Sequence, residues 1–254
     1  MTWLWGAIFA VAVALLALRL KALTIDGAIA AFVVGTVVFG AGGLPAALVL
    51  LAFFVPSSLL TRVGRARKRR ALADADHTAR TAWQVLANGG VAACCALGAL
   101  YWRTPFEAAF AGAIAAASAD TWATEIGTLS TRKPVSIATF RPVQTGMSGG
   151  VSTLGIAASV AGALCVAVVA WTLRVASLPA VLVGGFAGSL LDSLAGAILQ
   201  ARRWCPACGI ECESIVHRCG TRTQQRGGIA WLQNDAVNFM ATLCGALVAA
   251  AIAR

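Results

Sequence analysis

The stretch AGAIAAASADTWATEIGTLS, residues 111–130, is built almost entirely of small and apolar residues, yet it carries Asp120 and Glu125. Two further apolar stretches share this feature: GGFAGSLLDSLAGAILQ, residues 184–200, contains Asp192, and WLQNDAVNFMATLCGAL, residues 231–247, contains Asp235. A charge at membrane depth costs several kcal/mol unless it is paired, hydrated or bound to a cation. Only ten residues of the chain are acidic. The placement of four of them in such surroundings indicates a functional site within a membrane.

The whole chain has the composition of a polytopic membrane protein. Of its 254 residues, 59% are hydrophobic and 12% are charged, and the mean hydropathy is +0.80, which excludes an ordinary soluble domain. About 17–25 apolar residues are enough to cross a bilayer. Eight such spans can be placed, at about residues 2–18, 25–42, 45–61, 82–102, 106–129, 148–171, 178–200 and 231–253. We therefore expect an all-α fold of about eight transmembrane helices, forming a single integral-membrane domain over residues 1–254.

Basic residues predict the orientation of these helices. Segments that follow odd-numbered spans hold 17 of the 20 Lys and Arg residues, and the others are Arg103, Arg174 and Arg254. Because basic residues stay on the cytoplasmic side, we expect cytoplasmic charged loops and both termini outside the plasma or inner membrane. The run RVGRARKRR, residues 62–70, and the net charge of +10 are explained by this orientation and by contact with anionic lipid. Steering of anionic substrates is an alternative, and no nucleic-acid partner is required.

The acidic residues lie toward the predicted cytoplasmic ends of their spans. Asp120 is about ten residues from that end, on the order of 15 Å along the helix, and Asp192 has a similar depth. Further polar side chains occupy the same third of neighbouring spans: Gln84, Asn88, Asn234 and Asn238. We therefore expect a polar cavity that opens to the cytoplasm. The alternative is that Asp192, Gln84, Asn88 and Asn238 only make hydrogen bonds between packed helices.

A glycine-rich segment next to the acids suggests phosphate binding. RPVQTGMSGG, residues 141–150, ends in a turn that leads into the sixth span, and backbone N–H groups at such a turn can bind phosphate. Tight helix packing would also explain these glycines. Carboxylates suit Mg²⁺, which proteins bind through one or two carboxylates together with substrate phosphates. Carboxylates, cationic side chains and this turn around one cavity indicate phosphoryl or nucleotidyl transfer on a lipid.

The segment 201–230 between the last two spans carries a different pattern. CPACGIECESIVHRCG, residues 205–220, has the spacing C-x₂-C-x₃-C-x₄-H-x-C. Cytosolic thiols are normally reduced, so this spacing favours a structural Zn²⁺ site, with free thiols or a redox role as alternatives. Five candidates exist for four positions. The turns Cys-Pro-x-Cys-Gly and His-x-Cys-Gly favour Cys205, Cys208, His217 and Cys219, and leave out Cys212.

Several motifs resemble, in order, those of one integral-membrane family, which includes plant phytyl-phosphate kinase and an animal transmembrane protein of obscure role. The motifs are QVLANGG (84–90), ADTWATEIG (119–127), GMSGGVS (146–152), GSLLDSLAG (188–196), the Cys/His turns and WLQNDAVN (231–238). The resemblance extends from about Lys21 onward. ADTWATEIG is also similar to a motif of CTP-using dolichol and phytol kinases and, more distantly, of phosphatidate cytidylyltransferases. The chain departs from the family pattern at Met147 and Cys212.

The resemblance implies a membrane kinase that transfers a phosphoryl group from a nucleoside triphosphate, with CTP favoured, to a phytyl- or polyprenyl-type monophosphate. Its partners would be this isoprenoid lipid monophosphate, the nucleotide and membrane lipid. The expected catalytic acids are Asp120, Glu125, Asp192 and Asp235, the first three as Mg²⁺ ligands. The expected substrate-binding residues are Gln84, Asn88, Arg132, Lys133, Arg141, Ser148, Gly149, Gly150, Asn234 and Asn238.

Three alternatives to a kinase remain at this point, of which a non-enzymatic scaffold is disfavoured by the cost of the buried acids. A nucleotidyltransferase that forms a CDP-lipid would use the same kind of site. An ion-coupled lipid transporter or scramblase is less favoured, because the outer halves of the fourth to eighth spans contain almost only Ala, Val, Leu and Gly.

Overall fold

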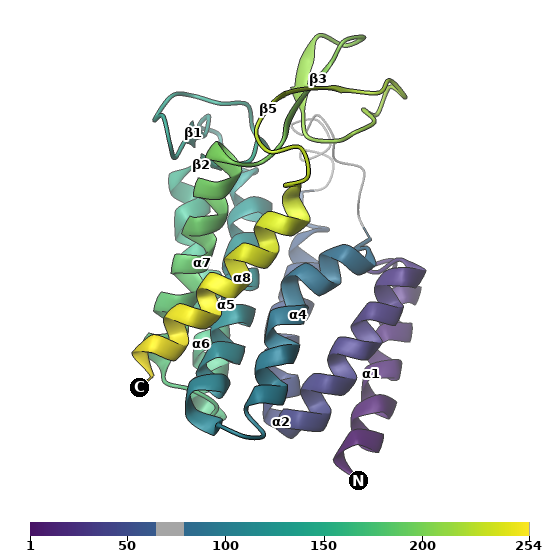
Figure 1. Ribbon diagram of the computed structural model, residues 1–254, viewed down its shortest axis with the longest axis vertical. Helices are drawn as coiled ribbons and strands as arrows, with labels where there is room; N and C mark the ends of the chain where they lie inside the picture. The colour runs from purple at the N-terminus through teal and green to yellow at the C-terminus, as the bar shows by residue number, and fades with distance from the viewer. Residues whose placement is uncertain (65–78, 254) are drawn as a thin grey trace.

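The computed structural model describes residues 1–64 and 79–253, and its helices run side by side along the long axis of the molecule (Figure 1). Each helix begins within five residues of the start of a predicted span. The helices of the described residues are α1 (Thr2–Arg19), α2 (Ile25–Leu60), α4 (Ala82–Gly98), α5 (Arg103–Gly127), α6 (Thr153–Thr172), α7 (Leu178–Ile198) and α8 (Asn234–Ile252).

α2 is a helical hairpin. Gly43 interrupts the helix with φ 65° and ψ −160°, a backbone conformation that is essentially restricted to glycine. Arg62 lies just past the end of α2, and Leu20 lies shortly before the start of α2. Arg62 donates a hydrogen bond to the carbonyl oxygen of Leu20, so the first and last residues of α2 lie at the same end of the molecule. The first arm, residues 25–42, and the second arm, residues 44–60, correspond to the second and third predicted spans.

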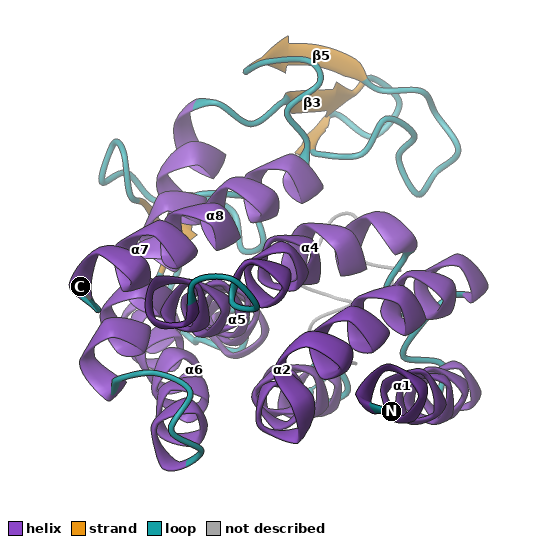
Figure 2. Ribbon diagram, turned by 60° about the horizontal axis from the view of Figure 1, so that its bottom comes forward, coloured by secondary structure: helices purple, strands orange, loops and turns teal. Residues whose placement is uncertain are grey.

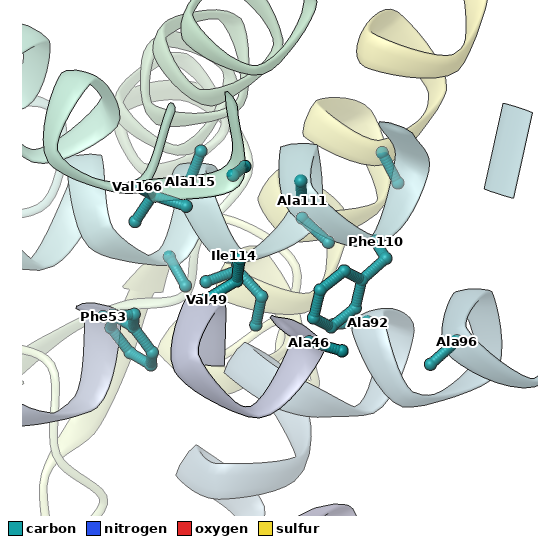
Figure 3. Packing of buried hydrophobic residues seen from close by; sticks show 14 of the residues in the cluster. Ala46, Val49, Phe53, Ala92, Ala96, Phe110, Ala111, Ile114, Ala115 and Val166 are labelled. Atoms are coloured by element: carbon teal, nitrogen blue, oxygen red, sulfur yellow. The ribbon is translucent and has the colours of Figure 1, made fainter. Parts of the chain in front are cut away.

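α5 is the central helix of the molecule. Residues 108–119 are all buried, and α5 packs against α2, α4, α6, α7 and α8. Side chains of these neighbours gather around Phe110 and Ile114 (Figure 3). Eight of these twelve buried residues are alanine, so adjacent backbones approach closely; a β-carbon on Gly112 would lie 2.4 Å from the β-carbon of Ala249 in α8. This close packing fixes the positions of the acids at the end of α5.

Several helices are suited to a membrane. In the described part of the chain, α1, α2, α6, α7 and α8 are long and apolar enough to cross a bilayer. α4 has 17 residues and is slightly shorter, and α5 is less apolar because it carries Asp120, Glu125 and hydroxyl residues. The protein is therefore an integral-membrane protein with several apolar helices, whereas the count of eight crossings remains a prediction.

Two small antiparallel sheets lie at the end of the helices opposite to both termini (Figures 1 and 2). β1 (Val135–Ser136) pairs with β2 (Gly150–Val151), and β3 (Arg202–Cys205) lies between β4 (Ile210–Cys212) and β5 (Gln224–Gly227). The chain is mostly helical, as expected, but it is not all-α. The segments that form these strands satisfy the hydrogen-bonding capacity of their backbone N–H and C=O groups by pairing with one another. For the same reason the sixth helix starts at Thr153 instead of residue 148.

The basic residues gather at the sheet end. Of the 17 assigned to the cytoplasmic side, five lie outside the described residues: Arg65, Arg67, Lys68, Arg69 and Arg70. The other twelve follow or precede helix ends on the side of the sheets, whereas Arg103 and Arg174 lie near the helix ends on the side of the termini. This separation agrees with the charge pattern from which the orientation was predicted, and the orientation itself remains a prediction.

Candidate functional site

A cavity of about 330 Å³ lies among the helix ends on the side of the sheets, lined by α4, α5, α6, α7, α8 and residues 145–151. It brings together residues that are far apart in the sequence. Ten predicted site residues line it: Gln84, Asn88, Asp120, Glu125, Ser148, Gly149, Gly150, Asp192, Asn234 and Asn238. Their functional roles remain predictions, but their expected convergence on one polar cavity is present in the fold.

Asp120 of α5 and Asp192 of α7 form the acidic centre of the cavity. Their carboxyl groups face each other closely enough to interact directly. Oδ2 of Asp192 and Oδ1 of Asn238 are buried and have no hydrogen-bond partner within the residues that the structure describes. A buried polar atom without a partner costs about 1–3 kcal/mol, so such atoms are typical of a ligand-binding position. This set of hard oxygen donors fits Mg²⁺.

Small residues explain why the two aspartates meet. A β-carbon on Gly188 of α7 would lie 2.5 Å from the β-carbon of Ala116 in α5, so only glycine permits this approach. Asp192 and Asp120 each follow this contact by four residues, about one helical turn. The contact between the two backbones therefore sets the register that places one carboxylate opposite the other.

Glu125 and Arg80 lie on another wall of the cavity. Glu125 Oε1 accepts a hydrogen bond of 2.7 Å from Thr61 Oγ1. The Arg80 guanidinium lies 5.2 Å from the ring centroid of Phe53 and 5.9 Å from that of Phe54. Burial lowers the pKa of Arg80 to about 10, while the charge of Glu125 opposes this shift. Arg80 therefore stays cationic at neutral pH and can bind an anionic group.

The backbone of Arg80 is held in place by the connection between α1 and α2. Its N–H donates to the carbonyl of Ala22 at 2.9 Å, and its carbonyl accepts from the Thr24 N–H at 3.1 Å. A β-carbon on Gly27 would lie 2.1 Å from the Arg80 oxygen. In the sequence Arg80 counts only among the basic residues that predict orientation, and its position just before the N-cap Thr81 of α4 is the one local signal for a place near the cavity.

The glycine-rich turn already binds a carboxylate. Gly146 and Gly149 have φ of 89° and 77°, and the Ser148 N–H donates to Glu213 Oε1 at 2.8 Å. Gln200 Nε2 donates to the other oxygen of Glu213, also at 2.8 Å. The turn precedes the N-terminus of α6, whose partial positive charge favours anions. Glu213 was missed because it lies within the Cys/His segment, where only the metal pattern was considered.

Four predicted residues do not line the cavity. Three of them are exposed: Arg132, Lys133 and Arg141. Asp235 is half-buried in the first turn of α8, but Asn234 and Asn238 line the cavity instead. Residues four apart share a helix face, and Asp235 is rotated from that face by about 100°.

Gln84 and Asn88 also have local structural roles. Gln84 Oε1 accepts from the Thr81 N–H at 3.0 Å as part of a capping box that begins α4. Asn88 Nδ2 donates to the Gln84 carbonyl at 2.8 Å. These bonds stabilise the first turns of α4 and hold both side chains at the cavity wall.

The Cys/His segment forms a compact cluster beside the three-stranded sheet. One ligand atom from each of four residues lies within 4.8 Å of the others: Cys205, Cys208, His217 and Cys219. Gly209, with φ 66°, donates its N–H to the Cys205 carbonyl at 2.9 Å, and Gly220, with φ 81°, donates to the His217 carbonyl at 2.8 Å. These two tight turns bring the ligands together as the sequence pattern indicated.

The chemistry of this cluster fits Zn²⁺. Thr221 and His217 lower the pKa of Cys219 to about 5, and the hydrogen bond with Cys219 raises the pKa of Cys208 to about 11, so one thiol of this pair ionises readily, as a metal ligand requires. Three sulfur atoms and one imidazole nitrogen are a common donor set for tetrahedral structural zinc. Cys212 is buried in β4 and is not part of the cluster.

Comparison with known proteins agrees with the motifs. The chain is 33% identical to Protein PGR of Arabidopsis thaliana, over 88% of this chain and 86% of that protein. It is 30% identical to an uncharacterized membrane protein of Methanocaldococcus jannaschii, over 92% and 87% of the two chains. It is 27% identical to the chloroplastic Protein VTE6 of Arabidopsis thaliana, over 91% of this chain and 66% of that protein.

No solved structure matches this chain. A family model described as integral membrane protein DUF92 matches residues 8–246, nearly the whole chain, and this confirms the family expected from the motifs. The chain therefore belongs to the integral membrane protein family DUF92.

Proposed function

We propose that this protein is a membrane kinase that transfers a phosphoryl group from a nucleoside triphosphate, with CTP favoured, to a phytyl- or polyprenyl-type monophosphate. One observation carries the proposal: Asp120 and Asp192 share a cavity with an anion-binding turn and with the cationic Arg80. Phosphoryl transfer depends mainly on positioning and on neutralising negative charge, and these groups supply both. In the predicted orientation the cavity faces the cytoplasm.

The residues divide the task between nucleotide and acceptor. Asp120, Asp192 and Glu125 would hold Mg²⁺, which when bound neutralises the phosphate oxygens of the nucleotide. The turn at residues 146–150 would bind nucleotide phosphates through its N–H groups, in place of the Glu213 carboxylate that accepts from Ser148.

Arg80 would bind the acceptor phosphate. Asn88, Asn234 and Asn238 would orient that phosphate from the α4 and α8 walls, where all three line the cavity. A role for Asp235 rests only on the motif resemblance.

The proposed reaction needs no strong base. An oxygen of the lipid monophosphate attacks the γ-phosphorus of the nucleotide and forms a new P–O bond. The bond between the γ-phosphorus and its bridging oxygen breaks, and the nucleoside diphosphate leaves with the electron pair. The attacking phosphate is already anionic near pH 7, because its second pKa is about 6. Among the described residues that line the cavity there is no histidine, which agrees with this chemistry.

The test uses the full-length protein in detergent with Mg²⁺, phytyl or geranylgeranyl monophosphate, and each of CTP, ATP, GTP and UTP. The nucleotides carry a label on either the γ- or the α-phosphate. We expect γ-label in a lipid diphosphate, with CTP as the best donor, and no transfer by Asp120→Asn. Transfer of α-label with release of pyrophosphate would replace the kinase with a CDP-lipid-forming nucleotidyltransferase. No label in any lipid would reject both enzymes.

We infer separately that Cys205, Cys208, His217 and Cys219 hold a structural Zn²⁺. Their ligand atoms are already gathered, and a structural zinc contributes folding free energy to a segment that is too small for its own hydrophobic core. Metal analysis of protein purified without chelator should find about one zinc per chain; its absence would reject the assignment.

A further inference from the structure

A second cavity, of about 80 Å³, lies between α1, both arms of α2, and α4. Its lining is almost entirely apolar and includes Val13 of α1, Ala31 of the first arm, and Leu50 and Phe54 of the second arm. Among the described residues, Arg80 is the one charged side chain that lines it. Glu125 offsets part of the cost of this charge from the polar side, and the apolar side offers the guanidinium only the two phenylalanine rings.

The two cavities meet at a shared wall. Arg80, Gln84 and Asn88 line both the polar cavity of the candidate site and the apolar cavity. The Arg80 guanidinium lies over Phe53 and Phe54, which also line the apolar side. A molecule that placed an anionic group against Arg80 could therefore extend an apolar chain away from the acids. From the first cavity to the second, the lining changes from polar to the cationic Arg80 and then to apolar side chains. A lipid phosphate, with its anionic head group and hydrocarbon chain, matches this order.

We propose that the apolar cavity binds the head-proximal part of the hydrocarbon chain of the lipid monophosphate, with Arg80 holding the phosphate at the junction. The identity of this lipid as the acceptor rests on the proposed kinase function. Charge complementarity selects an anionic head group, and the apolar lining selects a hydrocarbon tail over a second nucleotide or a peptide.

The size of the cavity limits what it holds. Its lining on the second arm runs from Ala47 to Phe54, about 10 Å at 1.5 Å per residue, compared with a hydrocarbon thickness of about 30 Å. Only the first part of a long isoprenoid fits. Phe9 lines the cavity and is 37% exposed on α1, so the remainder of the chain can pass from there into the surrounding lipid. The site therefore accepts chains of different length but requires an apolar segment next to the phosphate.

The direct test is photocrosslinking of the full-length protein in detergent with a prenyl monophosphate that carries a diazirine near its head group. We expect crosslinked peptides from α1 and the α2 arms, and competition by unlabelled phytyl monophosphate. Val13→Phe should fill the cavity and reduce crosslinking, whereas Val11→Phe, two residues away on an exposed position of α1, should leave it unchanged. Crosslinks confined to other helices, or equal crosslinking in both variants, would overturn the proposal.

Kinetics with two acceptors give a second readout. Val13→Phe adds more carbon to the pocket than one methylene, and the loss of room for a single methylene already costs about tenfold, so the KM for phytyl monophosphate should rise at least about tenfold. The KM for dimethylallyl monophosphate, whose chain ends near the junction, should change little. An equal rise for both acceptors would contradict the proposal. Phosphoryl transfer without crosslinks in α1 or α2 would reject this cavity but not the kinase activity. Crosslinks in α1 or α2 without phosphoryl transfer would reject the kinase activity but not lipid binding in this cavity.

Discussion

Asp192→Asn tests the acidic centre because it should change activity and stability in opposite directions. Asp192 faces Asp120, and its Oδ2 has no hydrogen-bond partner in the described part of the chain. Asparagine keeps the volume, removes one of two facing carboxylates and offers an NH₂ group that can donate to Asp120. A residue that only stabilised the helix packing would lose stability on this change. A metal ligand should lose activity while the protein becomes no less stable.

The expected magnitudes follow from the geometry. Two unit charges at about 4 Å attract or repel by about 4 kcal/mol at an effective dielectric constant of 20. Both side chains are partly exposed in the cavity, so solvent reduces this value, and we expect a gain of about 1 kcal/mol, or about 2–4 °C in Tm. The loss of one charge-stabilising group from a transition state lowers kcat by about 10²–10³-fold, and we expect a loss of this order.

The assay pairs two measurements on the same detergent preparation. Tm is measured without added Mg²⁺ and without a chelator, so that no added divalent cation offsets the repulsion and zinc stays on the Cys/His cluster, and kcat is measured with Mg²⁺, CTP and phytyl monophosphate. Glu107→Gln is the matched control, because Glu107 pairs with Arg103 at 3.1 Å at the opposite end of α5; it should keep wild-type turnover and change stability by less than about 0.5 kcal/mol. Wild-type kcat in Asp192→Asn would reject the metal role, and a lower Tm would reject the repulsion between the two facing carboxylates.

Three further changes test other parts of the site. Zinc chelation, or Cys205→Ser with Cys208→Ser, should remove the metal and lower Tm; unchanged Tm after confirmed metal loss would contradict a structural zinc. Glu213→Ala removes two charge-assisted hydrogen bonds from the turn and should lower Tm with a loss of about 1–3 kcal/mol, which a Tm equal to wild type would refute. A membrane-impermeant thiol reagent should label Ser148→Cys only from the cytoplasmic side, with protection by Mg²⁺ and nucleotide, and should label Arg174→Cys only from outside; the reverse pattern would refute the orientation.

The positions of the helices and the polar depth of the site could be predicted because both depend on local rules. Hydrophobic length and the alternation of basic residues gave helix starts within five residues of those observed. The rise of 1.5 Å per residue then put the acids of α5 and α7 at a common level. The rotation of each helix could not be predicted in the same way: in α8 the cavity receives Asn234 and Asn238 but not Asp235, because packing against its neighbours sets which face turns inward.

The residues that sequence analysis missed come from connecting segments. Arg80 reaches the cavity because its backbone pairs with Ala22 and Thr24, more than 50 residues earlier. Glu213 reaches it because β4 pairs with β3 after the last turn of α7. Such contacts depend on the path of the chain in three dimensions, and they cannot be predicted from the local periodicity of apolar residues in the sequence. The Cys/His cluster was the exception, since two short turns bring its side chains together within the segment itself.

Glu213 connects the Cys/His cluster to the membrane cavity, and this connection separates a structural zinc from a catalytic one. It follows Cys212 at the end of β4, and its two oxygens hold Ser148 in the turn and Gln200 after α7. Loss of zinc would release β4 and with it Glu213, the carboxylate that occupies the turn proposed to bind nucleotide phosphate, while Asp120 and Asp192 would stay fixed by helix packing. If the zinc is structural, its loss should therefore change the KM for nucleotide more than it changes kcat at saturating nucleotide. Loss of kcat alone would mean that the metal acts on the reaction and not through this carboxylate.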